Sequence, residues 1–447
     1  MMEMASAAAL MRDLRRGVRA PVQVRRADRE RYATDFGGLH ACTPRIVVHA
    51  ADEAEVSLVL RLARAADIPV AVRGSGHSFA GNALSPGILL CTTGGAPRWS
   101  LRGDGVVQVD AGARWGDWIP ALHARGRTLP ALSGLASATA GGTIATGGFG
   151  SGSPRAGAVT DHVRRLRLVT PDGAARWCSP DESAELFRFV CAGQGRLGVV
   201  TTAEFSTVTR PSIYRLRVQP LREAEELRNV AAWLASRGDD VPEFFFAEVG
   251  SAGGRAAFGT PVQTQAGSVL PAATLPSSGE MAILPPDALA DFRPPREPVG
   301  VMSALRHVWC DYCLPLATAD AFLAEVADGV RSGSLAAGLA RIYLLYLGAP
   351  GAAVAAYDPR GGAEPGPRIG VGVYHTLPAS DPAAVEHARW LHRGLLERCI
   401  ALGGRPYLAG AHEIDPALES RIYGHDARRL AQLRAALDPD GLFGPSL

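Results

Sequence analysis

One glycine-rich stretch places a single histidine at the centre of a tight turn. Residues 72–82 read V-R-G-S-G-H-S-F-A-G-N and follow the short apolar run 68–72, which is typical of a buried strand. Its glycines let the backbone turn sharply and bring several N–H groups to one point, as in turns that cradle a diphosphate. His77 is the nucleophile of this turn. The alternative is an ordinary strand-to-loop turn that happens to contain a histidine.

A second glycine-rich stretch makes that alternative less attractive. Residues 139–163 contain seven glycines among mainly small or hydroxylated neighbours. Such a run has too little side-chain volume to pack as an ordinary core helix or strand. It therefore indicates backbone that lies close against a large, flat ligand.

These two stretches, together with A-G-Q-G-R-L-G-V-V-T at 192–201, resemble the flavin-binding domain of vanillyl-alcohol-oxidase-type, or PCMH-type, FAD oxidoreductases. Within that superfamily the chain is most similar to the cytokinin dehydrogenase-like (berberine-bridge-enzyme-like) group, followed by alditol and aldonolactone oxidases. The segments 35–38, 309–315 and 406–408 point the same way.

The resemblance implies an FAD cofactor held covalently by an 8α-histidyl bond through His77. Residues 132–163 contain no cysteine, so the second, cysteinyl link of some relatives is not expected. By position, the diphosphate and adenosine side of FAD would contact Gly74, Ser75, Gly76, Ser78 and Asn82. The flavin side would contact Thr139, Gly142, Ala145, Phe149, Val199 and Tyr407.

The chain departs from the family at the catalytic base. Cytokinin dehydrogenases place an aspartate five residues before the threonine of this turn, where the present chain has Gly134. Removal of hydride still requires a group that takes the O–H or N–H proton, so the substrate domain must supply it. We expect His375, with Tyr374 beside it, or Glu248 to do so, although a histidine at a strand end is more often structural. Further candidates on predicted strands and near Tyr407 are His307, Asp311, Tyr312, Tyr343, Tyr346, His412 and Glu413.

The resemblance favours an FAD-dependent oxidoreductase that takes hydride from a small molecule and passes electrons to O2 or a quinone. Small residues such as Ala140 and Ala145 favour an oxidase slightly. Without the cytokinin-type base, we expect a specialised-metabolite alcohol, amine or dihydroaromatic as substrate. The alternatives are a flavin-containing scaffold that binds a metabolite or confers resistance, a redox-neutral cyclase, and, last, a UDP-sugar reductase.

The surrounding sequence predicts an α+β protein with two domains. We expect an FAD-binding domain of two α+β subdomains at 1–208 and a substrate domain, an antiparallel sheet covered by helices, at 209–404. Residues 405–447 would return to the FAD domain. The segment 250–300 is dense in Gly, Pro, Ala and Ser, which indicates a flexible segment over a pocket.

Composition limits the remaining possibilities. The chain has 447 residues, a formal net charge of +2 and 47% hydrophobic residues, which indicates a globular protein and does not favour nucleic-acid binding. The sequence shows neither a secretory signal nor a membrane-spanning run. Seven scattered cysteines do not form a disulfide framework, so we expect a cytoplasmic protein, and Cys310-x-x-Cys313 indicates a strand rather than a metal site. The sequence leaves the oligomeric state open.

Overall fold

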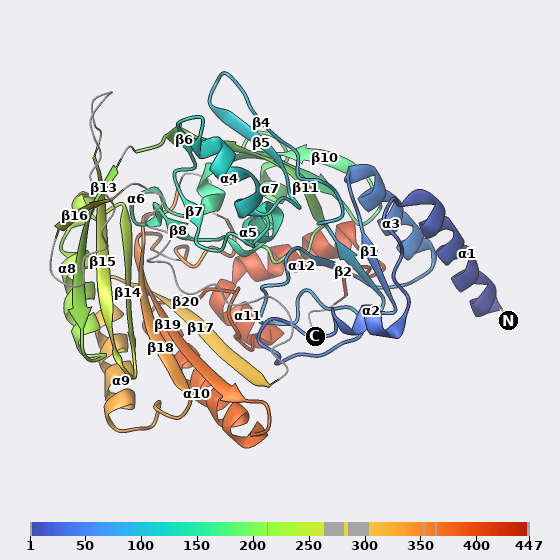
Figure 1. The fold of residues 1–447 in the computed structure, drawn as a ribbon. Coiled ribbons are helices and arrows are strands. Elements are labelled where there is room, and N and C mark those ends of the chain that lie inside the picture. The colour runs from blue at the N-terminus through green and yellow to red at the C-terminus, as the bar shows by residue number, and fades with distance from the viewer. Residues whose placement is uncertain are drawn as a thin grey trace.

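A computed structural model describes residues 2–211, 213–262, 281–284, 304–351, 355–362 and 364–444. The protein is α+β. Two small sheets of the N-terminal half form a first group, and one large sheet forms the second group on the other side of the molecule (Figure 1). The first group comprises a three-stranded parallel sheet in the order β1-β3-β2 and an antiparallel sheet in the order β10-β9-β11-β5-β4. The strands of these two sheets are β1 (Ile46–His49), β2 (Val70–Arg73), β3 (Ile88–Cys91), β4 (Trp99–Leu101), β5 (Val106–Asp110), β9 (Val163–Val169), β10 (Ala175–Cys178) and β11 (Val199–Ser206).

Helices pack against these two sheets and complete their cores. Helix α3 starts where the Asp52 side chain accepts a hydrogen bond from the backbone N–H of Glu55 at 3.0 Å, and its apolar stripe is buried. In the core of the antiparallel sheet, Trp115 and Trp118 from helix α4 pack near Phe205 of strand β11. The helices of this part are α1 (Met2–Gly17), α2 (Arg26–Glu30), α3 (Glu53–Ala65), α4 (Trp115–His123), α5 (Ala140–Thr146), α6 (Ser153–Ala156) and α7 (Ala184–Val190). Short elements join them: β6 (Arg127–Thr128), β7 (Leu132–Ser133), β8 (Gly150–Ser151), η1 (Val159–His162) and β12 (Val208–Thr209).

The expectation that the second glycine-rich stretch forms no ordinary helix is wrong for Ala140–Thr146, which is helix α5. The Thr139 side chain caps this helix by accepting from the backbone N–H of Gly142 at 3.2 Å. A Cβ on Gly141 would lie 2.9 Å from the Cβ of Ala111, so the helix approaches its neighbour through a glycine. Small residues here permit close packing of backbone rather than preventing a helix.

The second group is one antiparallel sheet of eight strands in the order β16-β13-β15-β14-β18-β19-β17-β20. Helices α8, α9 and α10 cover one face of it and enclose the largest core of the protein (Figure 1). Its strands are β13 (Ile213–Leu221), β14 (Phe244–Gly250), β15 (Gly253–Val262), β16 (Met281–Leu284), β17 (Leu305–Pro315), β18 (Leu339–Leu347), β19 (Arg368–Pro378) and β20 (Arg405–Pro406). Its helices are α8 (Glu226–Ala235), η2 (Gly238–Asp240), α9 (Ala319–Arg331) and α10 (Pro382–Ala401).

Two sequence expectations fall within this sheet. Cys310 and Cys313 lie buried in strand β17, which confirms that their motif is part of a strand. The segment 250–300, expected to be flexible, contributes strands β15 and β16, and its remainder, 263–280 and 285–300, lies outside the described residues.

The C-terminal helices α11 (Pro416–Tyr423) and α12 (His425–Leu437) pack back against the N-terminal half, below the elements coloured cyan in Figure 1. Two bonds of 2.9 Å join the guanidinium of Arg188 on α7 to Asp426 on α12. The backbone N–H of Val70 donates to the carbonyl of Leu442 at 2.8 Å. The chain therefore ends beside its own first sheet, while the domain boundaries at 208 and 404 stay predictions.

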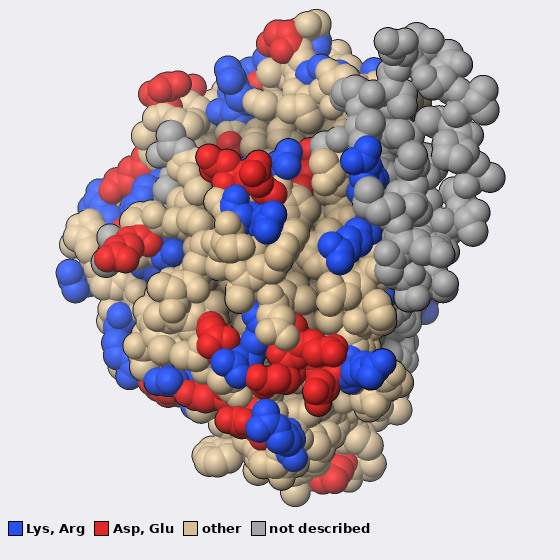
Figure 2. Space-filling model, turned by 90° about the vertical axis from the view of Figure 1, so that its left-hand side faces the viewer, with Lys and Arg blue, Asp and Glu red and all other residues tan. Residues whose placement is uncertain are grey.

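The surface carries charges of both signs. Figure 2 shows arginine and acidic side chains intermingled on the face at the left of Figure 1. Within the described part of the chain, none of the helices combines the length and apolar character needed to cross a bilayer.

A buried ion cluster links the second group of elements to the glycine-rich region. Arg360 is fully buried and donates to Asp161 at 2.8 Å and to Asp358 at 2.6 Å. Its guanidinium also lies 5.2 Å from the ring centre of Phe149. Asp161 also accepts a hydrogen bond from the backbone N–H of Ala158 at 3.0 Å. The cluster therefore holds the loop that carries Phe149 in place.

Arg360→Ala is expected to lower the free energy of unfolding by roughly 3–5 kcal/mol, because it leaves two buried carboxylates uncompensated. Urea unfolding followed by circular dichroism measures the change. The control is Arg228→Ala, which removes an ion pair to the exposed Asp320 and should cost about 0.2–1 kcal/mol. Equal destabilisation by the two changes would contradict a special role for the buried cluster.

Candidate active site

One cavity lies between the two groups of sheets. Its volume is about 450 Å³, within the range of small-molecule and cofactor sites. Both glycine-rich stretches, the segment 194–200 and strands β17, β18 and β19 line it. All the residues predicted to bind the cofactor lie on its wall: Gly74, Ser75, Gly76, His77, Ser78, Asn82, Thr139, Gly142, Ala145, Phe149, Val199 and Tyr407. Folding thus brings together the segments that the sequence singled out.

The glycine-rich end of the cavity fits a dinucleotide. A Cβ on Gly74 would overlap the hydroxyl of Thr139, and Gly76 has φ +80° with the Arg73 guanidinium packed beneath it. The two stretches can therefore approach each other only through glycine. Among the described residues that line the cavity, only Asp311 has a carboxylate, and it lies on the sheet, so no acidic group opposes a diphosphate at the glycine-rich end.

Side chains tie the loops of this end together. The amide of Asn82 donates to Oε1 of Gln194 at 2.8 Å, which joins the first turn to the third glycine motif. The hydroxyl of Ser75 donates to the carbonyl of Ser137. Sequence reasoning gave no role to Gln194 or Ser137, although Gln194 lies within the third glycine motif and Ser137 lies just before the second.

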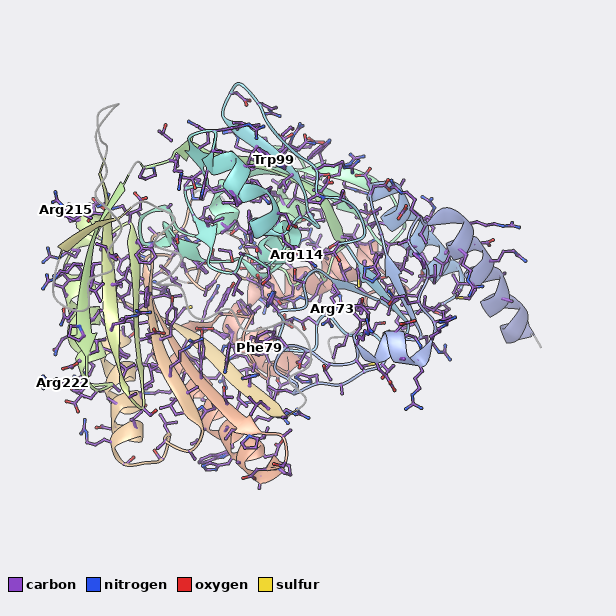
Figure 3. The ribbon with its side chains drawn as sticks, in the orientation of Figure 1. Arg73, Phe79, Trp99, Arg114, Arg215 and Arg222 are labelled. Atoms are coloured by element: carbon purple, nitrogen blue, oxygen red, sulfur yellow. The ribbon has the colours of Figure 1, made fainter. Side chains whose placement is uncertain are left out.

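His77 is held in place as a neutral imidazole. Its Nε2 lies 3.0 Å from the hydroxyl of Ser137, and its ring centre lies 5.5 Å from that of Phe36. Burial lowers the pKa of His77 to about 4, and the positive charges of Arg73 and Arg114 act in the same direction. Figure 3 shows Arg73 and Arg114 in the middle of the molecule. A neutral imidazole keeps a nitrogen lone pair, which a nucleophile needs.

Strand pairing builds the opposite wall. Trp309 on β17 pairs with Tyr374 on β19, and Tyr374 pairs with Arg341 on β18, so the three form one cross-strand row on the cavity face. The rings of Trp309 and Tyr374 are stacked with centres 5.0 Å apart. Phe79, from the loop of the first turn, lies 5.5 Å from Trp309. The wall formed by the sheet is therefore aromatic and adjoins the first glycine-rich turn through Phe79.

Asp311 lies one step along the same face. The Tyr374 hydroxyl donates to its Oδ1 at 2.9 Å. Gly372 is the partner of Asp311 on β19, and a Cβ there would come within 2.7 Å of that Oδ1 and 2.9 Å of the Tyr374 ring. Glycine at this position therefore lets the tyrosine lean across to the carboxylate.

The environment of Asp311 suits a general base. Burial raises the pKa of Asp311 to about 6, and the hydrogen bond from Tyr374 and the charge of Arg341 limit this rise. Burial also raises the pKa of Tyr374 well above its usual value, so its phenol stays protonated and donates. At neutral pH the carboxylate is ionised and close to the pKa at which proton transfer is efficient.

The prediction that His375 is catalytic is corrected by the geometry. Successive strand residues face opposite sides, so Tyr374 faces the cavity and His375 faces helix α10. His375 is fully buried, and its ring nitrogens lie 3.0 Å from His392 Nε2 and 3.1 Å from the carbonyl of Leu335. It is a satisfied core residue.

Glu248 does not line the cavity either. It lies on β14, with carboxylate oxygens 3.7 Å from Arg255 and 3.9 Å from Arg341. This geometry therefore does not support a direct catalytic role for Glu248. Its carboxylate lies near Arg341, which lines the cavity, but does not reach the cavity itself. Of the three residues predicted to be catalytic, Tyr374 alone reaches the cavity.

The other candidates divide in the same way. Asp311 and Tyr343 line the cavity. Tyr312 faces the helices, where its hydroxyl lies 2.8 Å from Nδ1 of His392, and His412 is bonded at 3.0 Å to the carbonyl of Asp311. The remaining candidates, which also lie away from the cavity wall, are His307, Tyr346 and Glu413.

Arg341 is a charged cavity residue that sequence reasoning missed. Strand β18 reads L-A-R-I-Y-L-L-Y-L, and alternation places Arg341, Tyr343 and Leu345 on one face. An arginine near the start of an otherwise apolar strand is the sequence feature that could have indicated a role for this position.

Comparisons with known proteins agree with the chemistry of the glycine-rich end. Residues 44–179 match the family model described as an FAD binding domain. This region includes His77, Gly134 and Thr139.

The relatives match this chain over less than half of its length. The protein of Rhodococcoides fascians named "uncharacterized oxidoreductase ORF5 in fasciation locus" is 35% identical over 189 residues, 41% of this chain and 42% of that protein. Cytokinin dehydrogenase 7 of Oryza sativa subsp. japonica is 29% identical over 206 residues, 44% of this chain and 39% of the relative. Cytokinin dehydrogenase 1 of the same plant is 33% identical over 188 residues, 40% and 35% of the two chains. The chain thus spans less than half the length of these relatives.

Proposed function

We propose that this chain, whose residues 44–179 match an FAD binding domain and which is similar to cytokinin dehydrogenases over part of its length, is an FAD-linked oxidoreductase of the vanillyl-alcohol-oxidase type whose base is Asp311. The observation that carries the proposal is the position of Asp311, the one carboxylate among the described lining residues. It lies on strand β17 of the large sheet, whereas His77 lies in the first glycine-rich turn, and both line the same cavity.

FAD, when bound, supplies a two-electron acceptor for hydride. Asp311 would take the proton from the O–H or N–H of the substrate while the neighbouring C–H bond breaks and its electron pair leaves as hydride. A C=O or C=N bond forms in the product, and O2 or a quinone would then take up both electrons. Tyr374 would hold the accepting oxygen of Asp311 in position, and the aromatic wall would exclude water.

The proposed base comes from a different element than the base of the family. Gly134 occupies the position of the family's aspartate, and a Cβ there would meet no atom within 4 Å. The loop therefore leaves open space where relatives carry a carboxylate, and Asp311 supplies that group from the sheet. A small-molecule alcohol or amine of specialised metabolism fits this step, and a dihydroaromatic would fit with the proton taken from a ring C–H and a ring C=C bond formed in place of C=O or C=N.

His77 would carry the flavin through the 8α carbon, as the resemblance implies. Its neutral imidazole and its position on the cavity wall support that proposal. Ala145 also lines the cavity, which leaves room for O2, whereas Ala140 is buried behind the wall. All seven cysteines are free, and we therefore propose the cytoplasm as its compartment.

Anaerobic titration tests the proposed activity. The purified yellow protein is mixed, without oxygen, with a panel of small alcohols, amines and dihydroaromatics, and the absorbance of the oxidised flavin is followed. At least one compound class is expected to bleach the flavin, with recovery on admitting O2 or a quinone. A flavin that stays oxidised throughout would favour a metabolite-binding scaffold instead.

A further inference from the structure

Arg341 is a largely buried cation whose N–H groups have no hydrogen-bond acceptor among the described residues. Its side chain is 16% exposed and lines the cavity from strand β18. Its guanidinium donates no hydrogen bond to any residue in the described ranges. The nearest carboxylate oxygen, on Glu248, is 3.9 Å away, and that carboxylate also lies 3.7 Å from Arg255.

Arg196 shows how the chain treats a structural arginine in the same cavity. Arg196 also lines the wall, but it donates to the carboxylate of Glu419 and, at 3.1 Å, to the carbonyl of Gly193. It further stacks on Tyr357 at 4.4 Å. Its donors are therefore occupied by the protein, whereas those of Arg341 remain available to a ligand.

The surroundings of Arg341 orient it for a planar anion. Its guanidinium carbon lies 5.5 Å from the ring centre of Trp309 and 5.3 Å from that of Tyr374, which hold one side of the group by cation–π contact. An arginine presents several N–H donors in a rigid fork that matches the two oxygens of a carboxylate. Leaving such donors unmet in a largely buried place costs free energy, which a bound carboxylate would recover.

Glu248 and Asp311 lie near Arg341 without accepting a hydrogen bond from it. Glu248 is 3.9 Å from Arg341 and 3.7 Å from Arg255, both longer than a hydrogen bond, and Asp311 is reached only by the charge of Arg341. Asp311 lies on β17, two strands from Arg341 on β18, a separation of roughly 10 Å between backbones at the usual strand spacing. A ligand that spans this separation can place its carboxylate on Arg341 and its O–H or N–H group at Asp311.

We propose that Arg341 is the anion-binding residue of this cavity and that the substrate is a ring-bearing carboxylic acid. Its carboxylate takes the forked N–H groups of Arg341, and its ring lies among the aromatic side chains of the wall. The proposal rests on the proposed function in one respect: Asp311 receives the proton of the O–H or N–H group attached to the carbon that is oxidised, and that carbon lies elsewhere in the same molecule.

The test compares two probes that differ only in charge. Benzoate and benzamide are titrated into the purified protein with its flavin at pH 8, where Asp311 is ionised, and binding is measured by calorimetry. We expect benzoate to bind at least about 10-fold more tightly than benzamide. In Arg341→Gln, we expect benzoate binding to weaken by roughly 10–100-fold, the size of a hydrogen-bonded charge pair, with benzamide binding unchanged.

The matched control is Arg255→Gln, which removes the other arginine beside Glu248 but lies off the cavity wall. It should bind benzoate like the unaltered protein. Equal affinity for the two probes, or unchanged benzoate binding in Arg341→Gln, overturns the proposal. Circular dichroism and flavin content verify that each variant is folded.

This experiment separates the anion site from the oxidoreductase activity. If benzoate discrimination depends on Arg341 but no compound bleaches the flavin, the anion site stands and the proposed activity fails. If compounds bleach the flavin but their methyl esters do so as fast as the acids, the activity stands and the carboxylate specificity fails.

Discussion

Replacing Asp311 by asparagine is expected to slow anaerobic reduction of the flavin by roughly 10²–10⁴-fold, the usual contribution of a positioned general base. The change keeps the size of the side chain, so Tyr374 and Gly372 can stay where they are. Only the capacity to accept a proton is lost. Stopped-flow absorbance, with a substrate found by the bleaching screen, measures the rate.

The pH dependence of the same rate provides a second readout. Asp311 must be ionised to act, so reduction should rise with pH through about 6 and level off above it. The hydrogen bond from Tyr374 lowers the pKa of Asp311, so Tyr374→Phe should move the inflection to higher pH. Asp311→Asn should abolish the inflection.

Glu248→Gln is the control for this prediction. Glu248 lies on the same sheet but off the cavity wall, and the change should leave the rate within a few-fold of the unaltered protein. If Glu248→Gln showed the large loss and Asp311→Asn did not, the assignment of the base would be wrong.

His77→Ala is expected to remove all covalently attached flavin. The flavin would still occupy the glycine-lined cavity, because the other contacts remain, and it would be released when the protein is denatured. Denaturing gel electrophoresis with flavin fluorescence should show a bright band for the unaltered protein and none for the variant. Since burial keeps the pKa of His77 near 4, attachment should proceed equally well at pH 6 and pH 8.

His307→Gln is the matched change for that experiment. His307 belongs to the same aromatic cluster, 6.1 Å from Phe36, but lies off the cavity wall. Its variant should keep the fluorescent band. A band that persists in His77→Ala would show that another residue, or none, holds the flavin.

The glycine-rich end of the site could be predicted from the sequence, because its signal is local. Gly74, Gly76 and Thr139 act through backbone conformation and close approach, which depend on residue type at fixed spacings. The resemblance to flavin-binding domains rests on the same residues, and the match at 44–179 agrees with it. Strand β17 likewise shows the period-2 pattern of a strand, and the helices over the large sheet show the amphipathic pattern of a helix.

The substrate end could not be predicted in this way. Alternation along 368–378 divides the strand into two faces, but the sequence does not say which face meets the cavity, so it predicts a catalytic role for Tyr374 and for His375 alike. The choice depends on long-range pairing, which sets Trp309 against Tyr374 and Asp311 against Gly372.

By itself, then, the amino-acid sequence determined the backbone turns that fit a dinucleotide and the histidine at their centre. Tertiary structure alone decided that Asp311 and Arg341 share a wall with Tyr374, and that burial brings the pKa of Asp311 to about 6. The physical reason is that turn conformation depends on neighbouring residues, whereas cross-strand contacts and burial depend on segments that meet only after the chain has folded.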